Sequence, residues 1–226
     1  MNDKKRVALH AASLVNDGMV VGLGTGSTAD YFIIELARRY REEGLNITAV
    51  ASSIVSQIKA QEQGLPLIAI EYLDRLDLYV DGADEVTPDN TLLKGQGSDL
   101  VKEKILAKAS EKFIVLADES KIVDHIGARF SIPVEVIPFA WSLVKKSLAL
   151  QGGEGELRKN SQGNGFAVSS HGSLILDLSF DSSIGHCQLD TILNNTPGIV
   201  EHGIFYHLAD IVLLAVNGKV QEKIGV

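Results

Sequence analysis

A glycine-rich segment, Gly22–Ala29, follows an apolar run and opens a helical pattern, which makes it the first candidate for chemistry. The run Met19–Leu23 predicts a strand, and the apolar spacing in Thr28–Tyr40 predicts a helix. Glycines let the backbone approach a ligand, and the first N–H groups of a helix attract an anion. We therefore predict a phosphate site. Its candidate contacts are Thr25, Gly26, Ser27 and Thr28.

The same segment also satisfies a loose dinucleotide-binding pattern, Gly24-x-Gly26-x-x-Ala29. Such a site needs an acidic residue at the end of the second strand, about 20 residues further on. The second predicted strand, Ile47–Ala51, runs into two serines and no carboxylate. A phosphate site is therefore favoured over a nicotinamide site, and a plain strand-to-helix turn is the remaining alternative.

An acidic segment, Asp81–Glu85, follows two strand-like runs, Leu67–Ile70 and Leu76–Val80. Ligands of open α/β sheets bind beyond the carboxyl ends of strands, so Asp81 and Asp84 would line that rim. The alternative is an acidic turn that only caps the next segment. The six histidines are scattered without zinc spacing, so no metal is predicted. The candidate contacts are Asp81, Gly82, Ala83 and Asp84.

A third motif, Lys94–Asp99, is a glycine-containing turn that leads into the helix predicted at Leu100–Ala109. An ammonium at Lys94 could stabilise a developing oxyanion, and Glu103 lies about one turn into the helix. For an isolated glutamate, pairing with a surface lysine at helical spacing is the plain alternative. Lys121 follows a further predicted strand and is otherwise a solvated lysine. The candidate contacts of the turn are Lys94, Gly95, Gln96 and Gly97.

Together the motifs bring a phosphate cradle, two aspartates, one or two lysines and a glutamate to the carboxyl edge of one sheet. This inventory suits abstraction of a proton next to the carbonyl of a sugar phosphate. A carboxylate moves the proton, and cations or polar donors hold the enediolate. The chemistry requires no bound cofactor, so the sequence predicts a small-molecule sugar phosphate as the ligand.

The elements that position these motifs alternate between strands and helices through the first 130 residues. This order predicts an α/β fold with a doubly wound, mostly parallel Rossmann-like sheet. After Phe130 the order becomes β-α-β-β-α-β, typical of a smaller ferredoxin-like α+β domain. Its hairpin is predicted as Ala167–Ser170 with Leu174–Ser179, and its last strand as Gly198–Phe205. The run Ile211–Val216 is expected to rejoin the first sheet, giving domains 1–130 plus 207–226 and 131–206.

The composition is that of a globular protein, with 226 residues, 45% of them hydrophobic, and a net charge of −8. It excludes a disordered chain, and an acidic chain without a basic stripe argues against nucleic acid. No apolar run reaches the roughly 18 residues of a membrane helix. The basic and apolar start of the chain is predicted as an amphipathic helix ending near Gly18 rather than a signal peptide. Cys187 is the only cysteine, which excludes an internal disulfide and suits the cytoplasm.

The three motifs and five further segments carry a resemblance to a known family. These segments are Gly22–Ala29, Tyr79–Glu85, Lys94–Gly97, Glu103–Ile105, Ala117–Lys121, Pro133–Pro138, Asn195–Gly198 and Gly203–Phe205. With them in this order over nearly its whole length, the chain resembles the type A ribose-5-phosphate isomerases.

The resemblance implies interconversion of ribose 5-phosphate and ribulose 5-phosphate in the pentose phosphate pathway. It implies that Glu103 is the general base between C1 and C2, and that Lys94 holds the enediolate oxygen. Asp81 would assist opening of the furanose ring, and Asp84 would orient a hydroxyl. The other contacts that it implies are Thr25–Thr28 for the phosphate and Lys121 beside the substrate. It further implies a homodimer or homotetramer without a metal.

The chain departs from the family pattern in two places. The usual glycine run after the lysine is interrupted by Gln96, and Asp99 stands where a small residue is common. A buried glutamine must find partners or lose about 1–3 kcal/mol, and a second carboxylate could raise the pKa of Glu103. Ser170–Ser173 replaces an Asp-Asn-Gly turn, which we expect to lie away from the site. These changes bear on rate and substrate preference more than on reaction class.

Two alternatives to the isomerase are a non-catalytic sugar-phosphate sensor on the same fold and an amino-sugar-phosphate deaminase. The presence of Glu103 and Lys94 argues against the sensor. A deaminase would need a well-placed histidine, and His125 is the only nearby candidate in the sequence.

Overall fold

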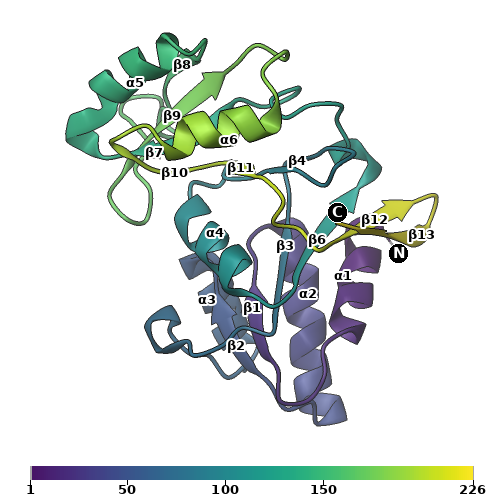
Figure 1. Cartoon of the computed structure of the whole chain (residues 1–226). Helices are drawn as coiled ribbons and strands as arrows, with labels where there is room; N and C mark the ends of the chain where they lie inside the picture. The colour runs from purple at the N-terminus through teal and green to yellow at the C-terminus, as the bar shows by residue number, and fades with distance from the viewer. Residues whose placement is uncertain (1, 226) are drawn as a thin grey trace. The chain divides into compact units, whose positions relative to one another are not determined.

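The computed structural model of the protein describes residues 2–225, which form two compact units (Figure 1). The first unit comprises the residues up to Ala83, Lys102–Ile122 and the residues from His207 onward. The second comprises Asp84–Val101 and Val123–Tyr206. Each unit has its own hydrophobic core. The predicted domain bounds, 1–130 plus 207–226 and 131–206, stay a prediction.

The first unit is built on a six-stranded sheet with the order β13-β12-β6-β3-β1-β2. Neighbouring strands pair in parallel, except that β12 and β13 form an antiparallel hairpin. The predicted doubly wound, mostly parallel sheet is confirmed, and Ile211–Val216 rejoins it beside β6 as expected. The strands are β1 (Val20–Leu23), β2 (Thr48–Ala51), β3 (Leu78–Gly82), β6 (Phe113–Asp118), β12 (Ile211–Val216) and β13 (Lys219–Ile224).

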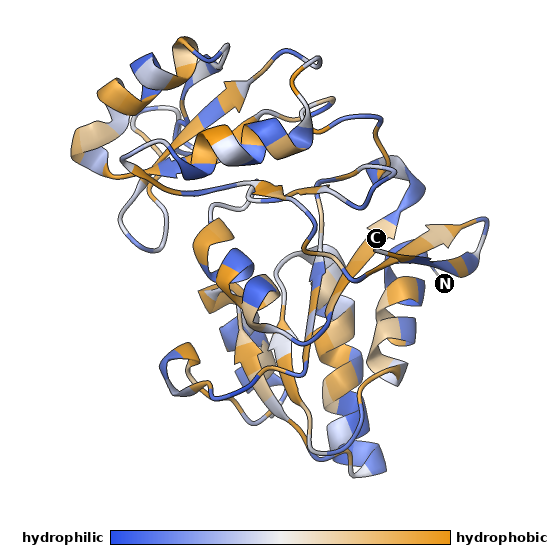
Figure 2. Ribbon diagram, viewed as in Figure 1, coloured by the Kyte–Doolittle hydropathy of each residue, from blue (hydrophilic) through white to orange (hydrophobic). Residues whose placement is uncertain are grey.

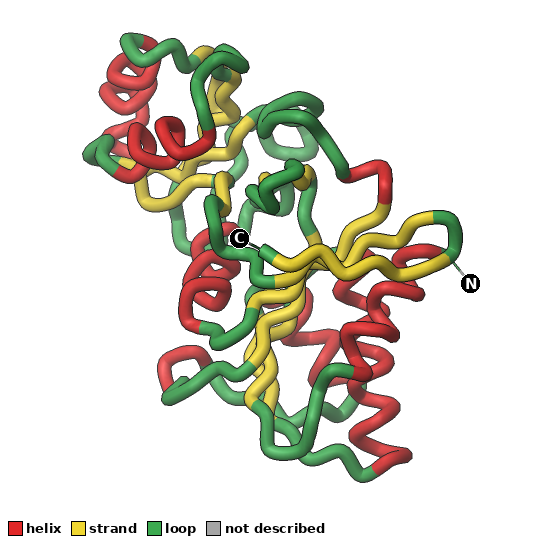
Figure 3. The backbone as a smooth tube through the Cα atoms, turned by 45° about the vertical axis from the view of Figure 1, so that its right-hand side comes forward, coloured by secondary structure: helices red, strands yellow, loops and turns green. Residues whose placement is uncertain are grey.

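Helices cover both faces of this sheet. The chain crosses from β1 to β2 in one direction and from β3 to β6 in the other, so right-handed connections place the intervening helices on opposite faces. Figure 3 shows α1 and α2 on one side of the sheet and α4 on the other. Apolar residues run along the strands and the inner sides of α1 and α2 (Figure 2). The helices are α1 (Asp3–Ser13), α2 (Ser27–Arg38), α3 (Ile54–Glu62) and α4 (Leu100–Ala109).

The second unit contains a four-stranded antiparallel sheet with the order β10-β7-β9-β8 and two helices. In chain order its elements run β-α-β-β-α-β, so the predicted ferredoxin-like module is confirmed. A small three-stranded sheet, β11-β5-β4, completes the unit. The elements are β4 (Glu85–Val86), β5 (Leu92–Leu93), β7 (Ile132–Val136), α5 (Trp141–Ala149), β8 (Glu154–Leu157), β9 (Leu174–Ser179), α6 (His186–Asn194), β10 (Ile199–His202) and β11 (Ile204–Phe205).

The sequence assigned the second strand of this module to the wrong residues. Ala167–Ser170 contributes only one bridge, between Val168 and Leu174, and a tight turn in which the Ser169 N–H donates to Ser173 O at 2.9 Å. The paired strand is β8, whose sequence Glu-Gly-Glu-Leu has one buried side chain and therefore no clear apolar alternation.

Two other strand predictions need correction, and one further strand of the six-stranded sheet was not predicted. Leu67–Ile70 lies beside the edge strand β2 but forms only one bridge to it, between Leu67 and Ala49. The residue before this segment is Pro66, which has no N–H to donate to a longer ladder. Gly198–Phe205 is divided at Gly203 into β10 and β11. Strand β13 was missed, although Asn217-Gly218 before it has the two positive φ angles, +48° and +74°, of a two-residue hairpin turn.

Candidate active site

The glycine-rich turn after β1 passes directly against Asp81 at the end of β3. The N–H groups of Thr25 and Gly82 donate to Asp81 Oδ1 at 3.0 and 2.7 Å. A Cβ on Gly24 would lie 2.1 Å from the same oxygen, so only glycine allows this close approach. Two of the sequence motifs therefore meet at one fully buried carboxylate.

The second oxygen of this carboxylate is held by Tyr79. Its hydroxyl donates to Asp81 Oδ2 at 2.5 Å, and its ring stacks on Phe113 with 4.9 Å between the ring centroids. Burial raises the pKa of Tyr79, and the negative charges of Asp81 and Glu103 raise it further, so the phenol keeps its proton. Asp81 thus accepts three hydrogen bonds, and Glu103 is close enough to influence the same phenol.

The hydroxyl of Thr25 is directed to a group of buried serines at the start of α3. It donates to Ser53 Oγ at 2.7 Å and lies 3.0 Å from Ser52 Oγ. Ser53 is also the N-cap of α3, with its side chain and that of Ser56 forming a capping box. The sequence reading missed these serines as site residues. Their place just after β2, at the same sheet edge as the glycine turn, is the signal that could have found them.

The N-terminus of α2 is open to an anion. Gly26 is its N-cap and has no side chain to occupy the first N–H groups. The Ser27 hydroxyl accepts a 2.8 Å hydrogen bond from Lys4 Nζ. A cavity of about 730 Å³ lies beside this turn, with Lys4, Ser27 and Ser120 in its lining. The sequence analysis did not single out Lys4, so the position of this lysine beside the turn was missed.

Glu103 and Lys121 complete the predicted residues of the first unit. Glu103 lies in the first turn of α4 and is only 8% exposed, which does not fit a surface partner of a lysine. Lys121 ends the short 3₁₀ turn that follows β6. Within residues 2–225, no hydrogen bond or ion pair joins Lys121 to the other predicted site residues, so its role stays a prediction.

In the second unit, Lys94 and the turn after it lie close to Asp84. The Lys94 N–H donates to Gly203 O at 2.9 Å, which joins the end of β5 to β11. Its side chain is 4% exposed, and Nζ lies 5.6 Å from the centroid of the Phe205 ring. The Gln96 N–H donates to Asp84 Oδ2 at 3.3 Å. The turn Lys94–Gly97 and one of the two predicted aspartates are therefore neighbours.

Glu85, the last residue of the acidic segment, has a structural role. Its carboxylate accepts backbone N–H bonds from Gly127 at 2.7 Å, Arg129 at 2.6 Å and Phe130 at 3.0 Å. It is fully buried and fixes the loop before β7. The idea of an acidic turn with a purely structural task thus applies to Glu85, whereas Asp84 contacts the Lys94 turn.

The residues that depart from the family pattern have partners of their own. Gln96 Nε2 donates to Ser131 O at 3.1 Å, which satisfies the glutamine. Ser170 Oγ donates to Asp99 Oδ1 at 2.5 Å, so the Ser170–Ser173 turn contacts the motif instead of lying away from it. Burial raises the pKa of Glu135, and the charge of Asp99 adds to this rise. An effect of Asp99 on Glu103 stays a prediction.

No group of three or more histidine, cysteine, aspartate or glutamate side chains within residues 2–225 is arranged to hold a metal ion. No helix in this part of the chain is long and apolar enough to cross a membrane. Cys187 is a free, exposed thiol.

A doubly wound sheet with a glycine turn, an open helix N-terminus and buried carboxylates at one edge defines a class: α/β proteins that bind phosphorylated ligands. The comparisons with known proteins identify the family within this class. Residues 48–219 match the family model described as ribose 5-phosphate isomerase A (phosphoriboisomerase A). The chain therefore belongs to the ribose 5-phosphate isomerase A family, whose members are aldose–ketose isomerases.

Curated relatives agree over almost the full length. Ribose-5-phosphate isomerase A of Thermosynechococcus vestitus is 42% identical, with 97% of this chain and 94% of the relative covered. The enzyme of Methanothermobacter thermautotrophicus is 45% identical, with 94% and 93% covered.

Solved structures agree as well. Ribose 5-phosphate isomerase A from Methanocaldococcus jannaschii superimposes with a TM-score of 0.92 at 39% identity, covering 98% of this chain and 97% of that one. A D-ribose-5-phosphate isomerase solved in complex with phospho-erythronic acid gives a TM-score of 0.94 at 36% identity, with 99% and 100% covered.

Proposed function

We propose that this protein interconverts D-ribose 5-phosphate and D-ribulose 5-phosphate through an enediolate, in the non-oxidative branch of the pentose phosphate pathway. The observation that carries the proposal is the nearly full-length match to the isomerase A family, with the motif residues present. The non-catalytic sensor and the deaminase find no support among these relatives.

In the proposed reaction, Glu103 removes the proton from C2 of the open-chain aldose. The C–H electron pair forms the C1=C2 bond of the enediolate, and negative charge develops on O1. Lys94 stabilises this oxygen, since a buried ammonium interacts strongly with a developing anion. Glu103 then returns the proton to C1, while the O2 hydroxyl proton passes to O1 to leave the ketose. No redox partner is needed, and a reaction without metal stays a prediction.

The remaining roles are proposed on geometry. Asp81, with both oxygens held by donors, has a fixed orientation for assisting opening of the furanose ring. Asp84 orients a substrate hydroxyl beside the Lys94 turn. The phosphate binds at the N-terminus of α2, where Ser27 and the basic Lys4 line the cavity. Lys121 is the remaining proposed contact.

Replacing Glu103 by glutamine tests the proposed base. Glutamine keeps the shape of the side chain but cannot accept the proton. We expect turnover of ribose 5-phosphate to fall by a factor of roughly 10² or more. Binding of phospho-erythronic acid, the ligand of the related solved structure, should persist. Turnover is followed as ketose formation, and binding by calorimetry.

Glu111→Gln is the matched control, because Glu111 follows the end of α4 and is exposed. It removes the same charge and should leave turnover within about twofold. Near-normal turnover in Glu103→Gln would remove Glu103 as the base. A wild-type protein that binds the sugar phosphate but forms no ketose would favour the sensor instead.

Two further parts of the proposal concern assembly and location. We propose a homodimer or homotetramer, which light scattering of the purified protein would distinguish from a monomer. A cytoplasmic location and the absence of nucleic acid as a partner also stay predictions, consistent with the acidic charge of −8 and the single cysteine.

A further inference from the structure

The backbone after Lys94 forms a tight turn. The Ser98 N–H donates to Gly95 O at 3.1 Å, which places Gln96 and Gly97 at the two corners. Gly95 has a φ of +95°, and Ser98, at +69°, has a conformation that non-glycine residues seldom adopt. Such a turn requires contacts from elsewhere to hold it in one conformation.

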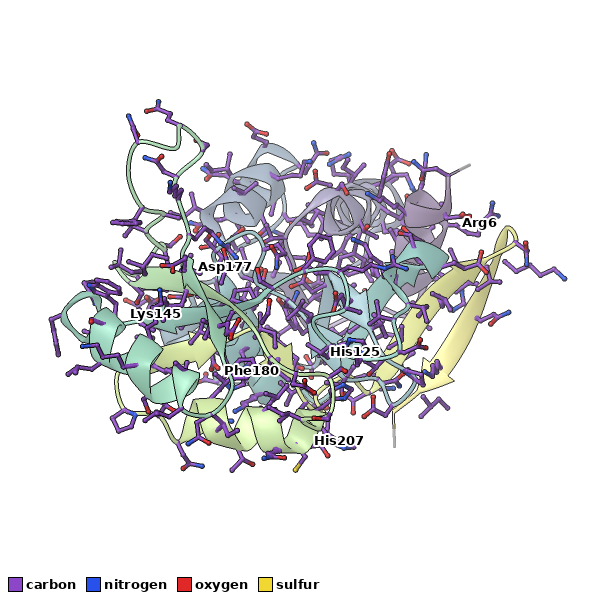
Figure 4. The ribbon with its side chains drawn as sticks, turned by 90° about the horizontal axis from the view of Figure 1, so that it is seen from above. Arg6, His125, Lys145, Asp177, Phe180 and His207 are labelled. Carbon is purple, nitrogen blue, oxygen red and sulfur yellow. The ribbon has the colours of Figure 1, made fainter. Side chains whose placement is uncertain are left out.

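Arg158, just after β8, supplies those contacts. Its Nη1 donates to Gly95 O at 3.2 Å, Gln96 O at 3.0 Å and Ser98 Oγ at 3.0 Å. The other edge of the guanidinium makes a two-pronged ion pair with Asp177 on β9, through Nε at 2.8 Å and Nη2 at 2.6 Å. Figure 4 labels Asp177 on its strand. The Arg158 side chain is 14% exposed, so the guanidinium is fixed on both edges in a largely buried place.

The direction of the two carbonyls determines the direction of two N–H groups. Every described peptide bond is trans, and in a planar trans peptide the N–H points opposite to the C=O. Because Gly95 O and Gln96 O both face Arg158, the N–H groups of Gln96 and Gly97 face away from it. The 3.3 Å hydrogen bond from the Gln96 N–H to Asp84 Oδ2 agrees with this direction. Successive N–H groups that face one side form a concavity suited to an anion.

We infer that Arg158 is a positioning residue for the isomerase reaction. By holding the carbonyls of Gly95 and Gln96, it keeps the Gln96 N–H on Asp84 and aims the Gly97 N–H at the substrate oxygen that becomes negative in the enediolate. The inference rests on the proposed function. It assigns Arg158 no contact with the substrate, and its effect comes through the turn alone.

The test compares Arg158→Lys and Arg158→Ala with wild type. A lysine keeps the charge but lacks the planar guanidinium, so it cannot bind two carbonyls and a carboxylate at the same time. Loss of a preorganised donor to an oxyanion lowers kcat by roughly 10²–10³-fold. Because Arg158 only positions such a donor, we expect its replacement to lower kcat by less, about 10- to 100-fold. KM for ribose 5-phosphate should stay within about threefold, because the N–H groups act on charge that develops after binding. Guanidinium ion at millimolar concentration should restore part of kcat in Arg158→Ala.

Lys145→Ala is the control for loss of an ion pair to β8. Lys145 of α5, labelled in Figure 4, pairs with Glu156 of β8 at 2.6 Å, and within residues 2–225 it makes no hydrogen bond or ion pair to the Lys94 turn. It should leave kcat unchanged. Thermal unfolding of each variant confirms that rates refer to folded protein.

A tenfold or greater loss of kcat with nearly constant KM, together with guanidinium rescue, supports the inference. Values of kcat within threefold of wild type in both Arg158 variants overturn it. So does a loss of activity that only tracks loss of folded protein and is not rescued, because Arg158 is then structural. A wild-type protein that forms no ketose overturns the proposed function itself, which is a different result from failure of the Arg158 variants alone.

Discussion

Asp81 and the turn after Lys94 are both expected to act on the substrate, but they are held in different ways. Asp81 is fixed by the N–H of Gly82 and the phenol of Tyr79, which lie beside it in the chain, and by the N–H of Thr25, 56 residues away in the turn after the paired strand β1. The Lys94 turn is fixed by a single side chain, Arg158, about 60 residues away in sequence.

This difference separates two ways of building precision. Around Asp81, the backbone at Gly24 comes so close to the carboxylate that only glycine fits, so an added side-chain atom should disrupt this region. The Lys94 turn is held by the Arg158 side chain, which donates to several acceptors, so loss of that side chain should disrupt the turn. We therefore expect steric changes to damage the first region most and polar deletions to damage the second.

Gly24→Ala should give the largest effect on the first region. The new Cβ would lie 2.1 Å from Asp81 Oδ1 and 2.6 Å from Asp81 Cα, so the backbone must shift. We expect a stability loss of about 1–3 kcal/mol, typical of overpacking. A displacement of this size near the reacting groups should also lower kcat/KM about 10²-fold. Urea unfolding and initial rates measure the two effects.

Gly185→Ala is the matched control. Gly185 has a φ of −65°, and no atom lies within 4 Å of an added Cβ. It should cost at most about 1 kcal/mol as the N-cap of α6 and should leave kcat/KM unchanged. If Gly24→Ala behaved like this control, the close approach of Gly24 to Asp81 would not matter for stability or activity. The two regions would then not differ in their sensitivity to added volume.

Tyr79→Phe should have a smaller effect on the same carboxylate. The variant keeps the ring against Phe113 but leaves Asp81 Oδ2 without its phenol donor. The expected cost is about 1–3 kcal/mol of stability, with kcat reduced about tenfold as the carboxylate gains freedom. Steady-state kinetics and urea unfolding measure both.

Tyr40→Phe serves as the comparison, since Tyr40 packs partly buried against the core of the first unit and is not one of the proposed site residues. Full activity in Tyr79→Phe would show that Asp81 stays fixed without the phenol. The contrast with the turn held by Arg158, where loss of one side chain is expected to lower activity, would then be sharper.

The two regions also differ in how much of them could be predicted from the sequence. The meeting of the glycine turn with Asp81 was predictable because each follows an apolar strand, and parallel strands end at a common edge. The burial of Glu103 could not be derived, since an isolated glutamate on a helix is more often exposed. Its role came from the family resemblance.

Long-range side-chain contacts away from the edge of the parallel sheet could not be predicted. Arg158 follows a strand with little apolar alternation, and nothing local points it at Gly95. The contact between Ser170 and Asp99 spans 71 residues in the same way. The order of strands and helices was predictable because apolar runs typical of strands alternate with apolar spacing typical of helices. Strands β4, β5 and β8 were missed because they are too short or too polar to show such a run.

Glu135→Gln should give the smallest effect and bears on the second region. Burial and Asp99 raise the pKa of Glu135 above its usual 4.5, so the folded protein binds this proton more tightly than the unfolded chain. The resulting stability is fully present below pH 4.5 and is lost as the pH rises through the folded pKa. Glutamine does not titrate, so the stability of Glu135→Gln relative to wild type should increase as the pH is raised from 4 toward neutrality. Urea unfolding across this range, with the exposed Glu154→Gln as the control for loss of a charge, checks the sign. A relative stability that falls with rising pH would mean that Glu135 is held as a stabilised anion, and a raised pKa of Glu135 would then be wrong.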